Sequence, residues 1–390
     1  MLIFRTAGES HGQALIALVE GLPANLPVDI EFIDNELKRR QGGYGRGGRM
    51  KIEKDRVRIL SGVRHGKTLG SPVAMMIENR DWPNWEEIMS VREINSDAAT
   101  KRTLTRPRPG HTALAGSLKF NQVDARNILE RSSARETTAR VAAGALAKVL
   151  LRSFGIEILS HTTAIGTVSV PEDFAVTWEQ LESLRDDEVV RCAIPEVGDR
   201  MVQEIEKAQK EGDTIGGTFE VIAKGLPTGL GSHVAWDTRL DGLLAQAVMS
   251  INAVKGVAIG IGVQGAFRKG SAVHDEIAYD SAQKRFYRLS NRAGGLEGGI
   301  TNGEDVRVTG YLKPIPTLKK ALKSVDMITK EPFVAQHERS DTCTVPAAGV
   351  IGETMVALVL ARAFLEKFGG DSLEETSRNY AGYLEQLRSY

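Results

Sequence analysis

The segment from Arg131 to Ala147 reads RSSARETTARVAAGALA, and it constrains the fold more than any other part of the chain. Val141, Ala145 and Val149 recur at helical spacing and form an apolar stripe. Gly155 follows the stripe and is expected to end the helix. The sequence therefore predicts a helix with one face buried in a core.

The polar start of this helix is suited to an anion. Ser133 and Glu136 have the spacing of a capping box, which predicts that the helix begins there. The first backbone N–H groups of a helix have no partner within it, and the helix dipole is positive at that end. Arg131, Arg135 and Arg140 add positive charge nearby. The segment predicts an anion site, and an ordinary capped core helix with solvated arginines is the alternative.

The overall charge of the chain argues against several classes of partner. The 390 residues include 50 basic and 50 acidic side chains, and 42% of them are hydrophobic. This composition is typical of a soluble globular protein and gives no indication of binding nucleic acid or a membrane. There is no signal-peptide pattern and no apolar run long enough to span a bilayer. Cys192 and Cys343 form no CxxC pair, so we expect no metal site, no disulfide and a cytoplasmic location.

Apolar periodicity predicts a mixed α+β fold. The expected strands are residues 2–6, 57–60, 73–78, 163–170, 218–224, 257–261 and 306–311. The further expected helices are residues 33–40, 237–251 and 350–368, with Gly369 and Gly370 ending the last. Strands and helices do not alternate regularly enough for a doubly wound parallel sheet. We expect a single domain over residues 1–390, in which the charged, irregular stretch 172–213 is a peripheral insertion.

Two short strings near the start contain candidate acid–base histidines. GESHG at residues 8–12 has the G-x-S-x-G pattern of serine hydrolases, but a nucleophile elbow needs earlier strands and only seven residues precede Gly8. A hydrolase with Ser10 as nucleophile is therefore disfavoured, and His11 is the candidate acid or base. RPRPGH at residues 106–111 places His111 after two arginines. An arriving phosphate would favour the protonated imidazole, so His111 is expected to supply a proton to a leaving group.

Glycine and arginine alternate between Arg39 and Asp55, in the string RRQGGYGRGGRMKIEKD. Guanidinium groups suit phosphates and carboxylates, and the string lacks the GK[ST] ending of a Walker loop. An RNA-binding segment of the RGG type is the alternative reading, although this chain is neutral and has one copy. Three later strings are weak indications alone: NRAGGLEGGITNG at residues 291–303, KPIPT at 313–317 and ERSDTC at 338–343.

Taken together, these strings resemble the signature blocks of the chorismate synthase family. The matching strings, in order along nearly the whole chain, are GESHG, GRGGRMKIEKDRVRILSGVRHGKTLGSP, RPGH, RSSARETTARVAAG, NRAGGLEGGITNG, KPIPT and RSDTC. The resemblance implies a lyase of the shikimate pathway that converts 5-enolpyruvylshikimate 3-phosphate to chorismate and phosphate by 1,4-anti elimination. It implies a need for reduced FMN without net redox change. It also implies a homotetramer, with helices between antiparallel sheets in each subunit.

The resemblance also implies roles for individual residues. His111 would protonate the departing phosphate, His11 would protonate or hold the reduced flavin, and Asp341 would help the flavin N5 accept the proton from C6. The residues expected to bind the substrate are Arg40, Arg46, Arg49, Arg108, Arg135 and Arg339, and Arg40 and Arg46 are also candidates for binding NADP. The residues expected to bind FMN are Arg131, Ser132, Ser133, Asn252, Ala253, Gly298, Lys313, Pro314, Ile315, Pro316, Thr317 and Arg339.

One position departs from the family pattern. Many members read GRHD where this chain reads ERSD, so Ser340 replaces a histidine whose role cannot be carried over. We still expect activity. No fused reductase domain is evident, which favours an external flavin reductase, while NADPH as the reductant stays open. A flavin- or NADP-dependent redox protein and an RNA-binding module are the alternative functions.

Overall fold

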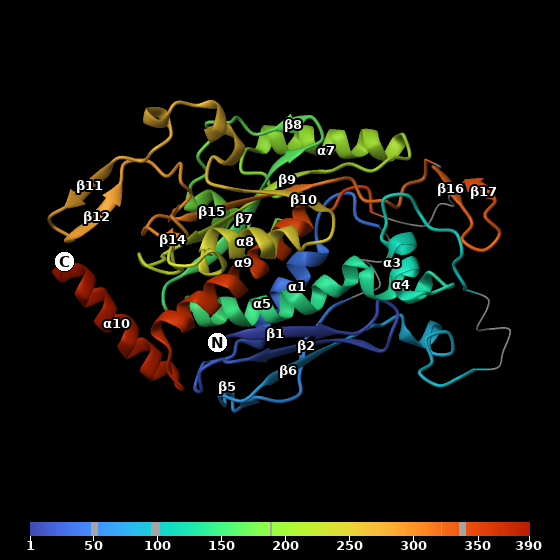
Figure 1. Cartoon of the computed structure of the whole chain (residues 1–390), viewed down its shortest axis with the longest axis horizontal. Coiled ribbons are helices and arrows are strands. Elements are labelled where there is room, and N and C mark those ends of the chain that lie inside the picture. The colour runs from blue at the N-terminus through green and yellow to red at the C-terminus, as the bar shows by residue number, and fades with distance from the viewer. Residues whose placement is uncertain (48–53, 95–101, 188, 321, 335–340) are drawn as a thin grey trace.

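Helices form the middle layer of the structure, between two antiparallel sheets (Figure 1). The computed structural model describes residues 1–47, 54–94, 102–187, 189–320, 322–334 and 341–390. The middle layer contains α1 (Ile30–Gln41), α5 (Thr137–Arg152), α8 (Leu240–Met249) and α9 (Val345–Phe368). This arrangement confirms the expected α+β class, with helices between antiparallel sheets.

The first sheet has the strand order β1-β2-β6-β3. Its strands are β1 (Ile3–Ala7), β2 (Ala14–Glu20), β6 (Val73–Glu78) and β3 (Arg58–Ile59). β2 alternates between buried and half-buried residues, and its buried side chains are Leu15, Ala17 and Val19. α5 packs against β1, β2 and β6, so this sheet and α5 share one core.

The second sheet has the order β10-β15-β9-β7-β8. Its strands are β10 (Val254–Ile259), β15 (Val306–Leu312), β9 (Gly217–Lys224), β7 (Glu157–Ile165) and β8 (Val168–Ser169). α9 packs against β7 and β9. A Cβ at Gly352 of α9 would lie 2.6 Å from the Phe219 ring, so glycine permits this close approach.

α9 is the central helix of the core. This corrects the expectation that no apolar run is long enough to span a bilayer: α9 is long and apolar enough, but 89% of its most apolar window is buried inside the protein. It therefore serves here as a core helix. It ends where expected, because Gly369 and Gly370 have φ angles of 54° and 107°.

A group of buried charges joins the helices of the middle layer. Arg39 of α1 forms a two-pronged salt bridge with Glu353 of α9, with both N–O distances 2.8 Å. Lys148 of α5 lies 2.6 Å from Glu353 and 2.7 Å from Glu36. Ser160 of β7 donates to Glu353 at 2.7 Å. The charges balance within the group, as burial requires.

The helix α5 does not start as the sequence predicted. The expected capping box is absent, because Ser133 Oγ accepts from the Arg135 N–H and caps the short 3₁₀ helix η3 (Ala134–Glu136) instead. The Glu136 carboxylate accepts hydrogen bonds from Thr6 and Arg140. Another helix, α4 (Arg126–Ser132), runs into this start. The expected end is confirmed, since α5 stops at Arg152 shortly before Gly155.

The other predicted elements differ mainly at their ends. β6 has the predicted bounds, whereas the strand predicted at 163–170 is split by a turn at Gly166, which has a φ of 58°. The helix predicted at 237–251 is divided into η4 (Trp236–Thr238) and α8. Two elements were not predicted from the sequence, β2 and the C-terminal helix α10 (Leu373–Ser389).

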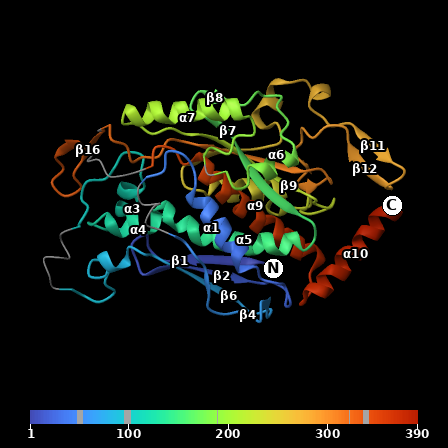
Figure 2. The same cartoon turned by 180° about the vertical axis from the view of Figure 1, so that it is seen from behind.

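The stretch 172–213 lies on the outer side of the second sheet (Figure 2). It contains α6 (Trp178–Ser183) and α7 (Pro195–Lys210), which contact β7 and β8. Met201 and Ile205 of α7 are fully buried in the main core.

The remaining described helices and hairpins are α3 (Ala113–Phe120), η2 (Trp82–Asn84), η5 (Gly262–Phe267), η6 (Gly270–Ala272), β4 (Val63–Arg64) with β5 (Lys67–Thr68), β11 (Ile277–Asp280) with β12 (Arg285–Arg288), β13 (Leu296–Glu297) with β14 (Ile300–Thr301), and β16 (Lys323–Val325) with β17 (Pro332–Val334).

Candidate active site

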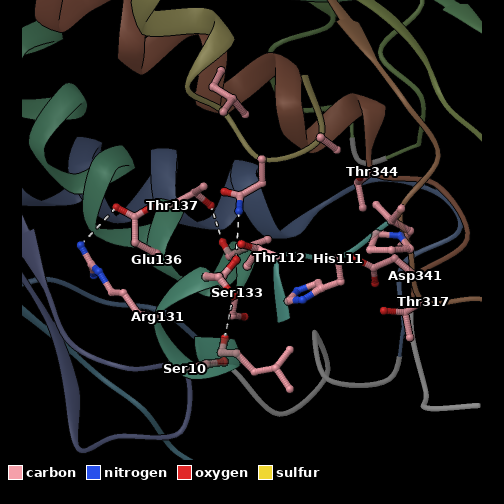
Figure 3. Close-up of a pocket in the computed structure, with 18 of the residues that line it drawn as sticks. Ser10, His111, Thr112, Arg131, Ser133, Glu136, Thr137, Thr317, Asp341 and Thr344 are labelled. Carbon is pink, nitrogen blue, oxygen red and sulfur yellow. Dashed lines mark hydrogen bonds and ion pairs between the residues drawn. The ribbon is translucent and has the colours of Figure 1, made fainter. Parts of the chain in front are cut away.

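A cavity of about 1130 Å³ opens at one end of the helical layer (Figure 3). The start of α9, the junction of α4 and α5, and the loop after α8 form part of its wall. The loops around residues 10–11, 102–112 and 312–317 form further parts of it, and Arg40, Arg46 and Trp85 also line it. Segments that are far apart in the sequence therefore meet here.

The cavity wall is strongly basic. Among the described residues, nine basic and three acidic side chains line it. The basic residues are Arg40, Arg46, Arg102, Arg108, Arg126, Arg131, Arg140, Lys255 and Lys313, and the acidic residues are Glu130, Glu136 and Asp341. Such an excess of positive charge favours a ligand with several negative charges.

Arg40, at the end of α1, is almost wholly buried in this wall. Its Nε donates to Thr137 Oγ1 at 2.9 Å and its Nη2 to the Ala134 carbonyl at 2.8 Å. Its Nη1 has no hydrogen-bond partner among the described residues and lies 3.8 Å from Asp55. Burial lowers the pKa of Arg40 to about 9, with Asp55 opposing this and Arg135 adding to it. An anion at Nη1 would offset this burial.

Arg135 lies behind the cavity rather than in its lining. Its Nη1 donates to both oxygens of Asp55, at 2.6 and 2.7 Å, and its Nε to Asn79 Oδ1 at 2.9 Å. The Arg135 guanidinium is therefore hydrogen-bonded to partners in the protein interior. The structure therefore separates Arg135 from Arg40 and Arg46, which line the cavity.

His111 lies in the cavity between Ser133 and Asp341 (Figure 3). The backbone N–H of Ala113 donates to His111 Nδ1 at 3.2 Å. Since Nδ1 accepts, the proton of a neutral His111 ring is on Nε2. Nε2 is then a donor.

His11 lines the same cavity, and its ring is held on two sides. Its Nδ1 lies 2.9 Å from Glu130 Oε1. The ring stacks on Trp85 with centroids 3.8 Å apart. Fixing Nδ1 leaves Nε2 as the ring nitrogen for a ligand.

Asp341 lies four residues before the start of α9, next to the glycine-rich loop. Its Oδ2 lies 3.2 Å from Arg46 Nε, and its Oδ1 accepts from the Gly47 N–H at 2.5 Å. Asp341 thus ties the described part of the arginine–glycine loop to the cavity. Arg49, Arg339 and Ser340 lie outside the described residues.

Most of the residues expected to bind FMN meet on one side of the cavity. Arg131 donates to the Gly8 and Thr6 carbonyls, at 3.1 and 2.9 Å. Asn252 donates to the Ser132 carbonyl at 3.1 Å, which joins the loop after α8 to the end of α4. Also lining the cavity are Ser133, Ala253, Lys313, Ile315, Pro316 and Thr317.

Among the described residues, two that were expected to bind FMN do not line this cavity. Pro314 faces a shallow neighbouring pocket. Gly298 lies in the turn between β13 and β14, next to Gly299, whose carbonyl accepts from the Leu240 N–H at the start of α8. Asn252 follows the other end of α8, so a ten-residue helix of about 15 Å separates the two positions.

The loop that carries His111 is braced by its neighbours. Arg108 Nη1 donates to Thr317 Oγ1 at 3.1 Å, and Lys313 Nζ donates to the Gly110 carbonyl at 2.8 Å. The RPRPGH and KPIPT strings, about 200 residues apart, therefore form one wall. This pairing brings the predicted substrate residue Arg108 into the cavity beside His111.

Several lining residues were not predicted from the sequence as site residues: Trp85, Arg102, Arg126, Glu130 and Lys255. No glycine cluster marks Trp85 or Arg102. Glu130 directly precedes the RSSARETTAR string, so that motif could have suggested it, and Arg140, the last residue of the string, also lines the cavity. In the part of the chain that the structure describes, no group of three or more His, Cys, Asp or Glu side chains is arranged to hold a metal.

Comparison with known proteins identifies the family. The family model described as chorismate synthase matches residues 2–365. Chorismate synthases from Solibacter usitatus and Geobacter sulfurreducens are 57% and 55% identical to this chain, and each alignment covers 100% of both proteins. A solved structure titled as a crystal structure of chorismate synthase has a TM-score of 0.80 and 43% identity, covering 100% of this chain and 99% of that one. This chain therefore belongs to the chorismate synthase family.

Proposed function

We propose that this chain converts 5-enolpyruvylshikimate 3-phosphate to chorismate and phosphate, the lyase activity expected of its family. The substrate carries one phosphate and two carboxylates. The observation that carries the proposal is the meeting of His11, His111 and Asp341 with nine basic side chains in one cavity. A polyanion is the class of ligand that this wall favours.

Arg40, Arg46 and Arg108 are the described arginines that we assign to the substrate. Arg40 supports this assignment because its buried Nη1 has no hydrogen bond among the described residues. Arg108 supports it because Thr317 positions the guanidinium beside His111. Arg135 would act indirectly, by holding Asp55. Arg49 and Arg339 stay predictions.

His111 would protonate the leaving phosphate. The 1,4-elimination breaks the bond from carbon to the phosphate oxygen and removes a proton from C6. The acid form of His111 is the imidazolium: the neutral ring, in which Nδ1 accepts from the Ala113 N–H, would have to gain a second proton before its Nε2–H could pass to an oxygen of the leaving group. Asp341, whose carboxylate lies 3.2 Å from Arg46, would assist transfer of the C6 proton to N5 of the flavin, the acceptor that the family resemblance implies.

The family requires a reduced flavin, and we propose FMN. When bound, it supplies electron density to the allylic centre as phosphate leaves, which explains a redox cofactor in a reaction without net redox change. The donor set fits this group: Arg131, Lys255 and Lys313 suit its phosphate, while Leu129, Ile315, Pro316 and Ile351 offer apolar surface to its ring system. The cavity exceeds the usual size for one small ligand, which leaves room for flavin and substrate together.

We propose an external flavin reductase as the source of electrons. NADPH bound at Arg40 and Arg46 would occupy the cavity that the substrate needs. We also propose a cytoplasmic homotetramer. The position of Gly298 supports a multimer, because a second copy would have to bring this glycine to a flavin held near Asn252. Cys192 and Cys343, both buried and unpaired, are compatible with a reducing compartment.

An anaerobic assay tests the proposed function. We expect wild-type protein with chemically reduced FMN and substrate to release phosphate while the flavin absorbance shows no net oxidation. Oxidised FMN is the control and should support no release. Consumption of NADPH in step with turnover would favour the redox protein instead, and absence of phosphate release under all conditions would reject the lyase.

A further inference from the structure

Glu130 and His11 form a close pair in the cavity wall. His11 Nδ1 lies 2.9 Å from Glu130 Oε1 and 3.0 Å from Oε2. The backbone N–H of His11 donates to the same Oε2 at 2.8 Å. A single carboxylate therefore contacts both the ring and the main chain of one histidine.

Glu130 is held firmly in this position. It is only 4% exposed, and Arg126, one turn earlier on α4, lies 3.2 Å from its Oε1. The Ser10 N–H donates to the Glu130 carbonyl at 2.9 Å, which fixes the His11 loop against α4. Burial acts to raise the pKa of Glu130, but the hydrogen bonds from His11 and the charges of His11 and Arg126 outweigh it and lower this pKa. The group is thus a carboxylate at neutral pH.

A carboxylate can only accept hydrogen bonds, so His11 Nδ1 must carry a proton. In the neutral ring, Nε2 is then the basic nitrogen. His111 has the opposite arrangement, because its Nδ1 accepts from Ala113 and its proton is on Nε2. The two cavity histidines are therefore set as one acceptor and one donor.

We propose that Glu130 is a positioning residue for His11: it fixes the Nδ1–H tautomer and turns Nε2 toward the ligands. This inference rests on the proposed function for its catalytic meaning. The contact of Nδ1 with the carboxylate is kept whether Nε2 accepts a hydrogen bond or a proton. His11 can then hold a proton or a positive charge beside an anionic ligand without leaving its place.

Trp85 completes the support. Its ring stacks on His11 with an interplanar angle of 22°, and the guanidinium of Arg102 lies 3.9 Å from the Trp85 ring centroid. His11, Trp85 and Arg102 form a stack that opposes rotation of the imidazole. The carboxylate sets the tautomer, and the stack sets the plane of the ring.

The same turn of α4 continues into the expected flavin site. Arg131 and Ser132 directly follow Glu130. A shift of Glu130 would therefore disturb His11 and the residues expected to bind FMN together. For this reason the test must read the imidazole itself, and loss of activity alone is insufficient.

NMR of protein labelled with ¹⁵N-histidine reads the tautomer directly, in the absence of substrate and flavin. His11→Asn identifies the His11 signals. We expect wild-type His11 to show the Nδ1–H tautomer. Glu130→Gln should retain it, because the amide oxygen still accepts, whereas Glu130→Ala should shift His11 toward the Nε2–H form. Glu136→Gln, which removes another carboxylate from the same cavity, is the matched control and should leave the tautomer unchanged.

Kinetics with reduced FMN supply the second measurement. Glu130→Ala should lower kcat at least about tenfold with little change in the substrate KM, and Glu130→Gln should recover part of the loss. An Nε2–H tautomer in wild-type His11 would overturn the inference, even if Glu130→Ala did not fold. An unchanged tautomer in folded Glu130→Ala would do the same. If wild-type protein releases no phosphate, the proposed function fails. The NMR measurement of the His11 tautomer still tests the positioning role of Glu130, because it needs no activity.

Discussion

Arg135 and Asp55 form a buried salt bridge behind the cavity, with Arg135 Nη1 2.6 Å from Asp55 Oδ1. The same carboxylate lies 3.8 Å from Arg40 Nη1. One negative charge therefore faces two arginines but is hydrogen-bonded to only one of them. The second arginine lines the cavity and retains its positive charge for a ligand.

Arg135→Gln should destabilise the protein by about 3–5 kcal/mol, because it breaks a buried ion pair. Urea unfolding of the ligand-free protein measures this change. Arg58→Gln is the control, since Arg58 and Glu78 form an exposed pair 4.0 Å apart, and we expect it to cost less than about 1 kcal/mol. Equal losses in the two variants would contradict a structural role for Arg135.

Arg40→Met should have a different effect from Arg135→Gln. Burial of Arg40 lowers its pKa to about 9, so its charge is costly in the ligand-free protein. Replacing it with a neutral side chain should change the free energy of unfolding by less than about 1–2 kcal/mol. The substrate KM should rise at least about tenfold, since a cavity cation is lost. A large loss of stability with an unchanged KM would reverse the roles that we give to Arg40 and Arg135.

His111→Ala should lower kcat by about 10²–10⁴-fold while changing the substrate KM little, because general acid catalysis acts on the transition state. His274→Ala, an exposed position away from the cavity lining, is the matched control and should keep full activity. Steady-state kinetics with chemically reduced FMN make the comparison. A His111→Ala variant with full turnover would remove this residue from the mechanism.

Acid should weaken the second sheet through Glu220. Burial acts to raise the pKa of Glu220, but hydrogen bonds from His161 and Arg307 and their charges outweigh it and lower the pKa from 4.5 to about 2. Because the folded-state pKa is the lower one, the stabilisation is complete above about pH 4.5 and is lost as the pH falls toward 2. It amounts to about 3 kcal/mol.

Glu220→Gln should reduce the dependence of unfolding free energy on pH between 5 and about 2. The variant is expected to be less stable than wild type at pH 7, and the difference should narrow as the solution is acidified. Denaturant unfolding at several pH values follows it. Parallel pH profiles for the two proteins would show that Glu220 does not contribute to the pH dependence of the free energy of unfolding.

Local patterns predicted much of the fold, but they could not supply its long-range pairs. The β6 run and the glycines after Phe368 are readable because apolar alternation and positive φ are local properties. The salt bridge of Arg39 with Glu353 joins positions 314 residues apart, and no local pattern in either segment indicates which residue pairs with it. The capping box failed because Glu136 has partners in β1 and α5 that outcompete the local cap.

The candidate site was predicted from several separate strings, and the structure shows that most of them meet. His11, His111 and Asp341 come from three distant segments and line one cavity. Arg135 belongs to the same strings but points into the interior, since Asp55 and Asn79 offer it partners. A motif fixes which residues are near a site, whereas the competing partners decide which of them face the ligand.

The most direct test of the account is a crystal structure of the protein with the substrate and oxidised FMN, a state in which turnover is not expected. We predict both ligands in the one basic cavity, in contact with each other. The substrate phosphate should lie within hydrogen-bond distance of His111 Nε2, and Arg40 should contact a substrate anion. Flavin and substrate bound in separate cavities, or a substrate that touches none of the basic cavity residues, would contradict the account.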